Sequence, residues 1–469
     1  MEEVEERRTP EGNKMNGQCN SPKASPNRTS LKTLFDQDAN SENEKILSMT
    51  SHCTSIFSFT DPSESPSQQD EKRHRLIQLL SIVRTSKKPL HHQVLSALME
   101  MISANILRPL PPPSKPSSSI TSDSDFPDEE DPVSKFCRTW SHLQLVYDIL
   151  LRLVTTTDPK TLSSYVDHHF LGRLLPLFQS EDPRERESLK NVYHRIYTRF
   201  TFYRSYMRKA MTNVFLNYVF ETEKHCGIGE LLEIWGSIIN GFTVPLKEEH
   251  KLFLMRVLIP LHKTKGMQGY HRQLAYCVCQ FVQKEPALGG VVVRGILKYW
   301  PVTNCQKEVL LIGELEELVE NIDPDQYRKL AMPLCAQITR CLNSWNSHVA
   351  ERALYVWNNE HFVRMASMAI EEVFPLLVEG IEKNLKWHWS KSVRQLTQNV
   401  KAMLEDMDPF LYSTCLDEID IRESEARQAE IKRKEKWDRV FDMAAAKNNH
   451  QFLQRRSPYT CVLSSTINV

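Results

Sequence analysis

The chain has 469 residues, and its 59 lysines and arginines balance 59 aspartates and glutamates, so its formal net charge is zero. Glycine is only 14 of these residues, about 3% against roughly 7% in average proteins, which disfavours β-rich folds with tight turns and phosphate-cradling loops. Without a basic excess, nucleic acid is an unfavoured partner, because phosphate contacts supply most of that affinity.

Cysteine usage and the lack of apolar spans indicate a compartment. The eleven cysteines are scattered without a regular framework, which is more typical of reduced thiols than of secreted disulfides. The first residues, MEEVEERRTP, contain no apolar signal region, and no apolar run approaches the ~20 residues that cross a bilayer. We therefore expect a cytoplasmic or nuclear protein with no membrane partner. The KRKEK stretch does not decide between the two compartments.

Residues 1–71 are rich in Ser, Asn, Pro, Glu and Lys, a composition that predicts a disordered N-terminal extension. Amphipathic segments such as RLIQLLSIV and QVLSALMEMIS follow, with apolar residues at helical spacing. Over residues 107–134 the polyproline, serine-rich and acidic stretch RPLPPPSKPSSSITSDSDFPDEEDP predicts a long solvated loop.

From there to residue 420, apolar helical segments recur almost every 20 residues, while the period-2 alternation of strands is nearly absent. Helix pairs repeating at roughly 40 residues are typical of HEAT or armadillo solenoids. The sequence therefore predicts an all-α helical-repeat solenoid over 72–420, with about eight two-helix repeats. Unrelated all-α domains are the alternative. Residues 421–469 predict a charged C-terminal helix and tail.

The sequence contains few signs of a catalytic, nucleotide-binding or metal-binding site. The sequence contains no Walker A loop, no H-E-x-x-H and no G-x-S-x-G. Cys277 and Cys279 form a C-x-C inside an apolar helix without a second ligand pair, which favours buried thiols over a zinc site. We therefore expect no metal, no cofactor and no catalytic residue, so that intrinsic enzyme activity is the weaker hypothesis.

The segment NVYHRIYTRFTFYRSYMR carries an informative surface strip beside its core-facing residues. On a helical wheel His194, Tyr197, Thr201 and Arg204 share one arc, with Arg195 further round. Aromatic rings beside guanidinium groups suit a short peptide, because rings form apolar pockets and arginines pair with carboxylate or phosphate.

Two following segments offer comparable pairs. Ile234 and Ile238 share a helix face at i, i+4, and Lys247 and His250 share one at i, i+3. In a solenoid, equivalent faces of successive helices line up into one groove. The pattern alone also allows a plainer interpretation, in which the isoleucines are core and the basic residues belong to a solvated face.

Several long blocks occur in one order between Arg75 and Leu416. They are SEDPRERESLKNVYHRIY, ETEKHCGIGELLEIWGSIINGF, PLKEEHKLFLMRVLIPLHK, YHRQLAYCVCQF, GILKYWPVTN, GELEELVE and HVAERALYVWNNEH. In these blocks the chain closely resembles the B-prime regulatory subunits of protein phosphatase 2A.

The resemblance implies a crescent of HEAT-like repeats that joins scaffold and catalytic subunits in a heterotrimer and selects clients without contributing a catalytic group. It also implies a concave groove for motifs of the form Leu-x-x-Ile-x-Glu in client proteins. The residues that match the family's groove are His194, Arg195, Tyr197, Arg204, Ile234, Ile238, Lys247 and His250. Among them, the two isoleucines are expected to form the apolar floor, and Lys247 and His250 to meet the motif's glutamate. Arg195 is expected to favour acidic or phosphorylated residues within the ligand.

The chain departs from the family pattern at positions that bear on these expectations. Thr198 and Arg199 follow HRIY where the family usually has glycine and lysine, and Thr201 falls where the family often has a leucine. Three further departures are Cys226, Trp235 and Gly313. They indicate a divergent paralogue, and they leave open whether motif preference or assembly differs. The alternative function is a helical-repeat adapter or scaffold unconnected to a phosphatase.

Overall fold

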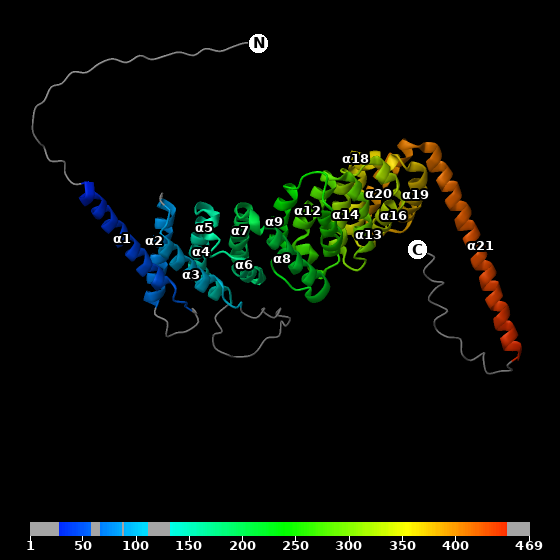
Figure 1. Ribbon diagram of the computed structural model, residues 1–469. Coiled ribbons are helices and arrows are strands. Elements are labelled where there is room, and N and C mark those ends of the chain that lie inside the picture. The colour runs from blue at the N-terminus through cyan, green and yellow to red at the C-terminus, as the bar shows by residue number, and fades with distance from the viewer. Residues whose placement is uncertain (1–27, 58–65, 87–88, 111–131, 448–469) are drawn as a thin grey trace, which may run out of the picture. The chain divides into compact units, whose positions relative to one another are not determined.

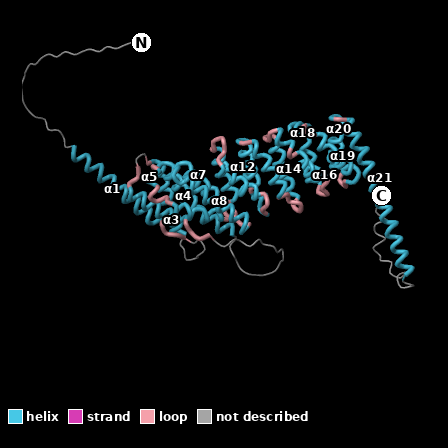
Figure 2. Tube along the Cα trace, turned by 45° about the vertical axis from the view of Figure 1, so that its right-hand side comes forward, coloured by secondary structure: helices cyan, strands magenta, loops and turns pink. Residues whose placement is uncertain are grey.

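The computed structural model describes residues 28–57, 66–86, 89–110 and 132–447. Within these ranges the chain forms helices joined by short loops and contains no strand (Figure 2). None of the described helices is both long and apolar enough to cross a bilayer. The chain divides into two compact units, the first built from residues up to 108 and 124–157, the second mainly from residue 158 onward.

The first unit is a small helical group. Its helices are α1 (Arg28–Cys53), α2 (Pro66–Thr85), α3 (His92–Ile106) and α4 (Pro132–Thr156). Helix α1 packs on α2 and α3, and α4 packs on α2 and α3. Leu79, Leu98 and Leu150 are among the fully buried side chains of its core.

The N-terminal part differs from the sequence prediction of disorder over residues 1–71. Helix α1 buries Ile46, Met49 and Cys53 among its neighbours, and α2 already begins at Pro66. The prediction missed this because these three buried apolar side chains, with the buried Thr50 among them, hardly change the average composition of a polar segment. Residues 1–27 lie outside the described part, as does most of the predicted 107–134 loop.

The second unit contains two rows of helices, each stepping along the unit at intervals of about 40 residues (Figure 1). In the first row each helix contacts the next, and in the second row the contacts run from the first helix through the π-helical turn Leu254–Leu258 to the later helices. The first row consists of α7 (Pro183–Arg199), α9 (Ile228–Asn240), α12 (His271–Lys284), α14 (Cys305–Val319), α17 (Ser347–Tyr355) and α20 (Lys391–Met407). The second row consists of α8 (Arg204–Asn217), α10 (Glu248–Phe253) with α11 (Ile259–Leu261), α13 (Gly289–Lys298), α16 (Ala331–Leu342), α19 (Ile370–Trp387) and α21 (Pro409–Lys447). This arrangement confirms the predicted helical-repeat architecture.

Shorter helices fill the junctions of the second unit. They are α5 (Pro159–Leu162), α6 (His168–Leu174), α15 (Pro324–Arg328) and α18 (Glu360–Ser367). The core lies between the two rows and is aliphatic and aromatic, with Phe215, Phe281 and Phe374 almost fully enclosed. Burial of these side chains supplies the main stabilisation of such stacked helices.

Asp-Pro pairs begin several helices of the second unit. Asp182 is the N-cap of α7, where its side chain accepts a hydrogen bond from the Arg184 backbone N–H at 2.9 Å, and Pro183 follows at the first turn. The Glu185 carboxylate accepts a hydrogen bond from the Ser180 hydroxyl at 2.6 Å. These caps fix where α7 begins, and therefore which of its residues reach the far end of the helix.

Candidate functional site

A cavity of about 370 Å³ opens in the second unit where the C-terminal ends of α7 and α9 meet the beginnings of α8 and α10. We call it the cationic groove. Its lining residues are His194, Tyr197, Thr198, Arg204, Arg208, Ser237, Ile238, Gly241, Phe242, Thr243, Lys247, Glu249 and His250. In Figure 1, α7, α8 and α9 lie together in this part of the unit.

Arg204 enters the groove because the helix that the sequence pattern suggests across residues 191–208 is interrupted. The α7 helix ends at Arg199, Phe200 leaves the helical conformation, and α8 begins at Arg204. The Arg204 guanidinium then donates to the carbonyl oxygens of Tyr197 (3.0 Å) and Thr198 (2.9 Å). These carbonyls lie at the electronegative C-terminal end of α7, which favours a cation.

Tyr197 forms an aromatic wall between two arginines. The Arg204 guanidinium carbon lies 5.4 Å from the centre of the Tyr197 ring, a cation–π contact. The Tyr197 hydroxyl accepts a hydrogen bond from Arg208 Nη1 at 3.2 Å, and Arg208 Nη2 lies 4.0 Å from Glu249 Oε1. Both arginines are therefore held in place before a ligand arrives, which lowers the entropic cost of binding.

The apolar part of the groove comes from Ile238 and Phe242. Ile238 lies near the end of α9, and Phe242 follows in the loop after it. The Phe242 ring stacks on the His250 ring, with centres 3.6 Å apart and planes within 2° of parallel. The buried Nδ1 atom of His250 has no hydrogen-bond partner among the described residues. An aliphatic side chain placed in this part of the groove would contact the carbon atoms of Ile238 and Phe242 and lie close to the His250 ring.

The electrostatic character of the groove is positive. Arg204, Arg208 and Lys247 line it, against the single carboxylate of Glu249. Burial lowers the pKa of His194, and the nearby Arg195 lowers it further. Burial also lowers the pKa of His250, with Glu249 opposing the change. Both imidazoles are therefore neutral near pH 7, and a carboxylate in the groove meets the arginines and the lysine.

Six of the eight residues that the sequence singles out line the groove, namely His194, Tyr197, Arg204, Ile238, Lys247 and His250. The other two do not. Ile234 is 1% exposed and lies in the core one turn before Ile238, because the groove opens only at the last turn of α9. Arg195 is exposed and does not line the groove, since adjacent residues on a helix point about 100° apart.

The sequence interpretation missed Arg208, Phe242 and Glu249. Arg208 could have been predicted from the sequence, because it follows Arg204 by one helical turn in RSYMR. Phe242 was not, because its contact with His250 depends on the loop between α9 and α10, which contains a cis Val244–Pro245 peptide bond. Helical periodicity carries no information about such a loop.

The departures from the family pattern fall at different places. Thr198 lines the groove, whereas Thr201 is exposed outside it. Trp235 is buried, stacks on Phe253 at 3.8 Å and lines a neighbouring cavity of about 500 Å³ that shares three residues with the groove. A side chain at Gly313 would meet the Arg352 guanidinium, since a Cβ there lies 3.2 Å from Nη2.

The described residues contain no cluster of histidine, cysteine and carboxylate side chains suited to a metal ion. Cys277 is buried, and burial raises its pKa to about 12, so it is an unreactive thiol. Fold and groove together define the class: a helical-repeat protein with a cationic groove formed by four of its helices.

The comparison with known proteins identifies the family. The profile described as "Protein phosphatase 2A regulatory B subunit (B56 family)" matches residues 31–444, so the chain belongs to this family. Among its relatives in Arabidopsis thaliana, the B' beta isoform of the 57 kDa regulatory subunit of serine/threonine protein phosphatase 2A is 45% identical over 85% of this chain and 79% of its own length. The B' epsilon isoform is 42% identical over 92% and 90%, respectively.

Proposed function

We propose that this chain is a non-catalytic substrate-specificity and targeting subunit of the protein phosphatase 2A heterotrimer, joined to scaffold and catalytic subunits. In this role it binds client proteins through short Leu-x-x-Ile-x-Glu motifs in the cationic groove. Membership of the family supports the regulatory role. The observation that carries the motif proposal is the apolar surface of Ile238 and Phe242 next to Arg208 and Lys247 in one cavity.

The groove suits the isoleucine and the glutamate of such a motif. The isoleucine side chain packs on Ile238 and Phe242, and the glutamate carboxylate pairs with Lys247, with His250 beside it. An extended peptide loses conformational freedom on binding, so we expect micromolar affinity, about −7 to −8 kcal/mol. That affinity is sufficient, because tethering raises the effective concentration of nearby phosphosites at the catalytic subunit.

Under this proposal the chain supplies no chemistry of its own and works in the cytoplasm, the nucleus or both. Purified chain should not hydrolyse a phosphopeptide, whereas the reconstituted heterotrimer should dephosphorylate motif-bearing clients faster than motif-deleted ones. Co-purification with scaffold and catalytic subunits separates this role from an adapter unconnected to a phosphatase.

Calorimetry with a Leu-x-x-Ile-x-Glu peptide tests the groove directly. We expect Lys247→Ala to weaken binding at least tenfold, because a charge-assisted contact is lost. Lys265→Ala is the matched control, since Lys265 is an exposed lysine outside the groove lining. Arg204→Lys should weaken binding too, because a lysine cannot donate in a planar fork to both α7 carbonyls and still stack on Tyr197. Unchanged affinity in both groove variants would remove the assignment.

Salt provides an independent check on the nature of the contacts. The affinity should fall as ionic strength rises from 0.05 to about 0.5 M, because partly exposed charge pairs are screened over about a Debye length. A groove that bound only through apolar surface would show no such decline.

A further inference from the structure

A second cavity adjoins the cationic groove, between α8 and the helical segment that begins with α10. Its volume is about 500 Å³, and Arg208, Glu249 and His250 line both this cavity and the groove. We call it the indole cavity, because Trp235 of α9 lines it. Since the two cavities share these three side chains, a chain bound in the groove can continue into the indole cavity.

The walls of the indole cavity are largely apolar. The rings of Trp235 and Phe253 stack with their centres 3.8 Å apart and their planes within 14° of parallel, and both side chains are buried. Leu216, Leu252 and Val257 add aliphatic carbon. Leu252 is 42% exposed, so this wall is open to solvent. A concave site with such a lining suits a large apolar side chain.

The indole of Trp235 carries a hydrogen-bond donor that the fold does not use. The side chain is 3% exposed, and its Nε1 atom has no partner among the described residues. A buried indole N–H usually finds an acceptor, because an unpaired buried donor is destabilising. The Nδ1 atom of His250, on the wall shared with the groove, is also buried without a partner. Two such atoms favour a peptide as the ligand, since its backbone offers both donors and acceptors.

The charges around the indole cavity are mainly positive. Lys209 and Arg256 are exposed, line the cavity and make no ion pair within the ranges that the structure covers. Arg208 lies 4.0 Å from Glu249, which is the single carboxylate among the lining residues. A ligand with acidic residues is therefore favoured.

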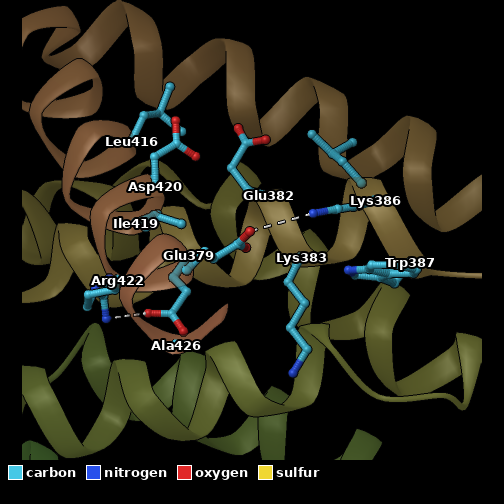
Figure 3. Close-up of a pocket in the computed structure, with 12 residues that line it drawn as sticks. Glu379, Glu382, Lys383, Lys386, Trp387, Leu416, Ile419, Asp420, Arg422 and Ala426 are labelled. Atoms are coloured by element: carbon cyan, nitrogen blue, oxygen red, sulfur yellow. Dashed lines mark hydrogen bonds and ion pairs between the residues drawn. The ribbon is translucent and has the colours of Figure 1, made fainter. Parts of the chain in front are cut away.

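A cavity of about 740 Å³ between α19 and α21 differs in this respect (Figure 3). There Arg422 pairs with Glu379 at 3.0 Å, and Lys386 lies 3.8 Å from Glu423. These cations already have partners within the chain, whereas Lys209 and Arg256 at the indole cavity do not. Unpaired cations beside an open apolar wall thus distinguish the indole cavity as a binding site.

We propose that the indole cavity is a second subsite for the client chain, and that it takes a large apolar side chain next to acidic residues, just beyond the glutamate of the Leu-x-x-Ile-x-Glu motif. This inference rests on the proposed function, in which that glutamate meets Lys247 beside His250. Phe253 and Val257 follow His250 by about 4–10 Å along the helical segment, at about 1.5 Å per residue. Two or three extended residues span that distance, so the apolar side chain is expected two or three positions after the glutamate.

The preference for this side chain is expected to be particular to this chain. Trp235, which forms the floor of the indole cavity, is one of the positions at which the sequence departs from the family pattern.

Calorimetry on the full-length chain tests the inference with two amidated nine-residue peptides. Both contain the Leu-x-x-Ile-x-Glu motif followed by two aspartates, and they end in phenylalanine or in alanine. We expect the phenylalanine peptide to bind about tenfold more tightly, because only its last side chain fills the apolar cavity. Trp235→Leu, which removes the indole and keeps an apolar side chain, should reduce this ratio of affinities to below threefold.

A second variant covers the case in which Trp235→Leu fails to fold. Leu252→Asp changes an exposed residue and places a carboxylate in the apolar wall, so it should also reduce the ratio to below threefold. Met255→Asp is the matched control and should keep the ratio, because Met255 is 40% exposed on the same helical segment but does not line the cavity.

The outcomes separate this inference from the proposed function. Equal affinities of the wild-type chain for the two peptides overturn the inference and leave the motif assignment intact. A ratio that persists in both Trp235→Leu and Leu252→Asp also overturns it. So does self-association in sedimentation that only Leu252→Asp abolishes, since the occupant is then a second copy of this chain. A wild-type chain that binds neither peptide overturns the motif proposal and this inference together.

Discussion

Replacing Glu314 by glutamine tests how strongly a buried carboxylate between two histidines stabilises the second unit. The side chain of Glu314 is 2% exposed, and its two oxygens accept hydrogen bonds from His262 Nε2 at 3.0 Å and His271 Nε2 at 2.9 Å. His262 is completely buried, and its Nδ1 donates to the Ile259 carbonyl at 2.9 Å. Since both nitrogens of His262 face oxygen acceptors, the ring is an imidazolium paired with a carboxylate.

The magnitude follows from the burial of this pair. Removing one partner of a buried ion pair costs about 3–5 kcal/mol, because the other charge is left without compensation. Glutamine keeps the shape of Glu314 and one acceptor oxygen, so we expect about 3 kcal/mol, the lower end of that range. For a unit of about 290 described residues, such a loss lowers the melting temperature by about 5 °C, at an unfolding entropy of about 2.1 cal/mol/K per residue.

The pH dependence gives this prediction a sign. Burial alone would raise the pKa of Glu314, but His262 and His271 outweigh it and lower the pKa from 4.5 to about 2. The contribution of Glu314 is therefore present above pH 4.5 and is lost as the pH falls towards 2. Burial would lower the pKa of His262, but Glu314 outweighs it and raises the pKa above 6.5. The contribution of His262 is thus complete below pH 6.5 and is lost as the pH rises through the folded-state value.

Circular dichroism melts at about pH 5.5 and 9 measure both effects, since the lower pH lies between the two unfolded-state values. Glu317→Gln, an exposed glutamate on the same helix, is the matched control. We expect the deficit of Glu314→Gln to be largest at the lower pH and to shrink at the higher one. Equal melting temperatures for the two variants at the lower pH, or a deficit that does not shrink, would refute the paired-charge interpretation.

Three further outcomes are expected. Burial lowers the pKa of Lys72 from 10.5 to about 8, so urea titrations should show the unfolding free energy rising from about pH 8 to 9, below the range where the raised pKa of Cys53 opposes it, and Lys72→Met should abolish the rise. Gly227→Ala should lower the free energy of unfolding by about 1–3 kcal/mol in thermal melts, because a Cβ there lies 2.4 Å from the Phe178 carbonyl oxygen. Gly269→Ala is the control and should not lower it in this way, because a Cβ at Gly269 meets nothing within 4 Å. Burial lowers the pKa of His250 below 6.5, so the ring gains its charge only below that pH, and calorimetry should show stronger motif binding as the pH falls from about 6.5 to 5, a trend absent in His250→Gln.

The repeat architecture was predictable because the sequence pattern that indicates it is local and recurs in every repeat. Apolar residues at helical spacing recur in every repeat, and Asp-Pro pairs mark helix starts at Asp182 and Asp323. The same signal failed for α1, where Ile46, Met49 and Cys53 are buried within an otherwise polar sequence. Burial there is decided by the neighbouring helices and not by composition.

The groove was predictable only in part, because helical wheels assume that helices continue. The interruption at Phe200 moves Thr201 out of the groove, although the wheel places it beside Tyr197. Arg204 stays in the groove because its guanidinium bonds to the carbonyls at the end of α7. The helical wheel places Ile234 and Ile238 on one face of the helix. It does not show that Ile234 lies in the core while Ile238, one turn later, lines the groove.

The net charge of the chain is zero, but its positive side chains are not all paired with negative ones. Along the second unit, basic and acidic side chains about one repeat apart neutralise each other across adjacent helices, as in Arg186–Glu230 at 2.7 Å and Lys190–Glu233 at 2.5 Å. At the cationic groove this pairing is looser, with Arg208 Nη2 4.0 Å from Glu249 Oε1. The Arg204 guanidinium donates hydrogen bonds to the Tyr197 and Thr198 carbonyls. Lys247 makes no ion pair within the part of the chain that the structure describes. Under the proposed function, the glutamate of a client motif completes there the charge pairing that the chain completes for itself elsewhere, and Lys247 is the cation that it meets.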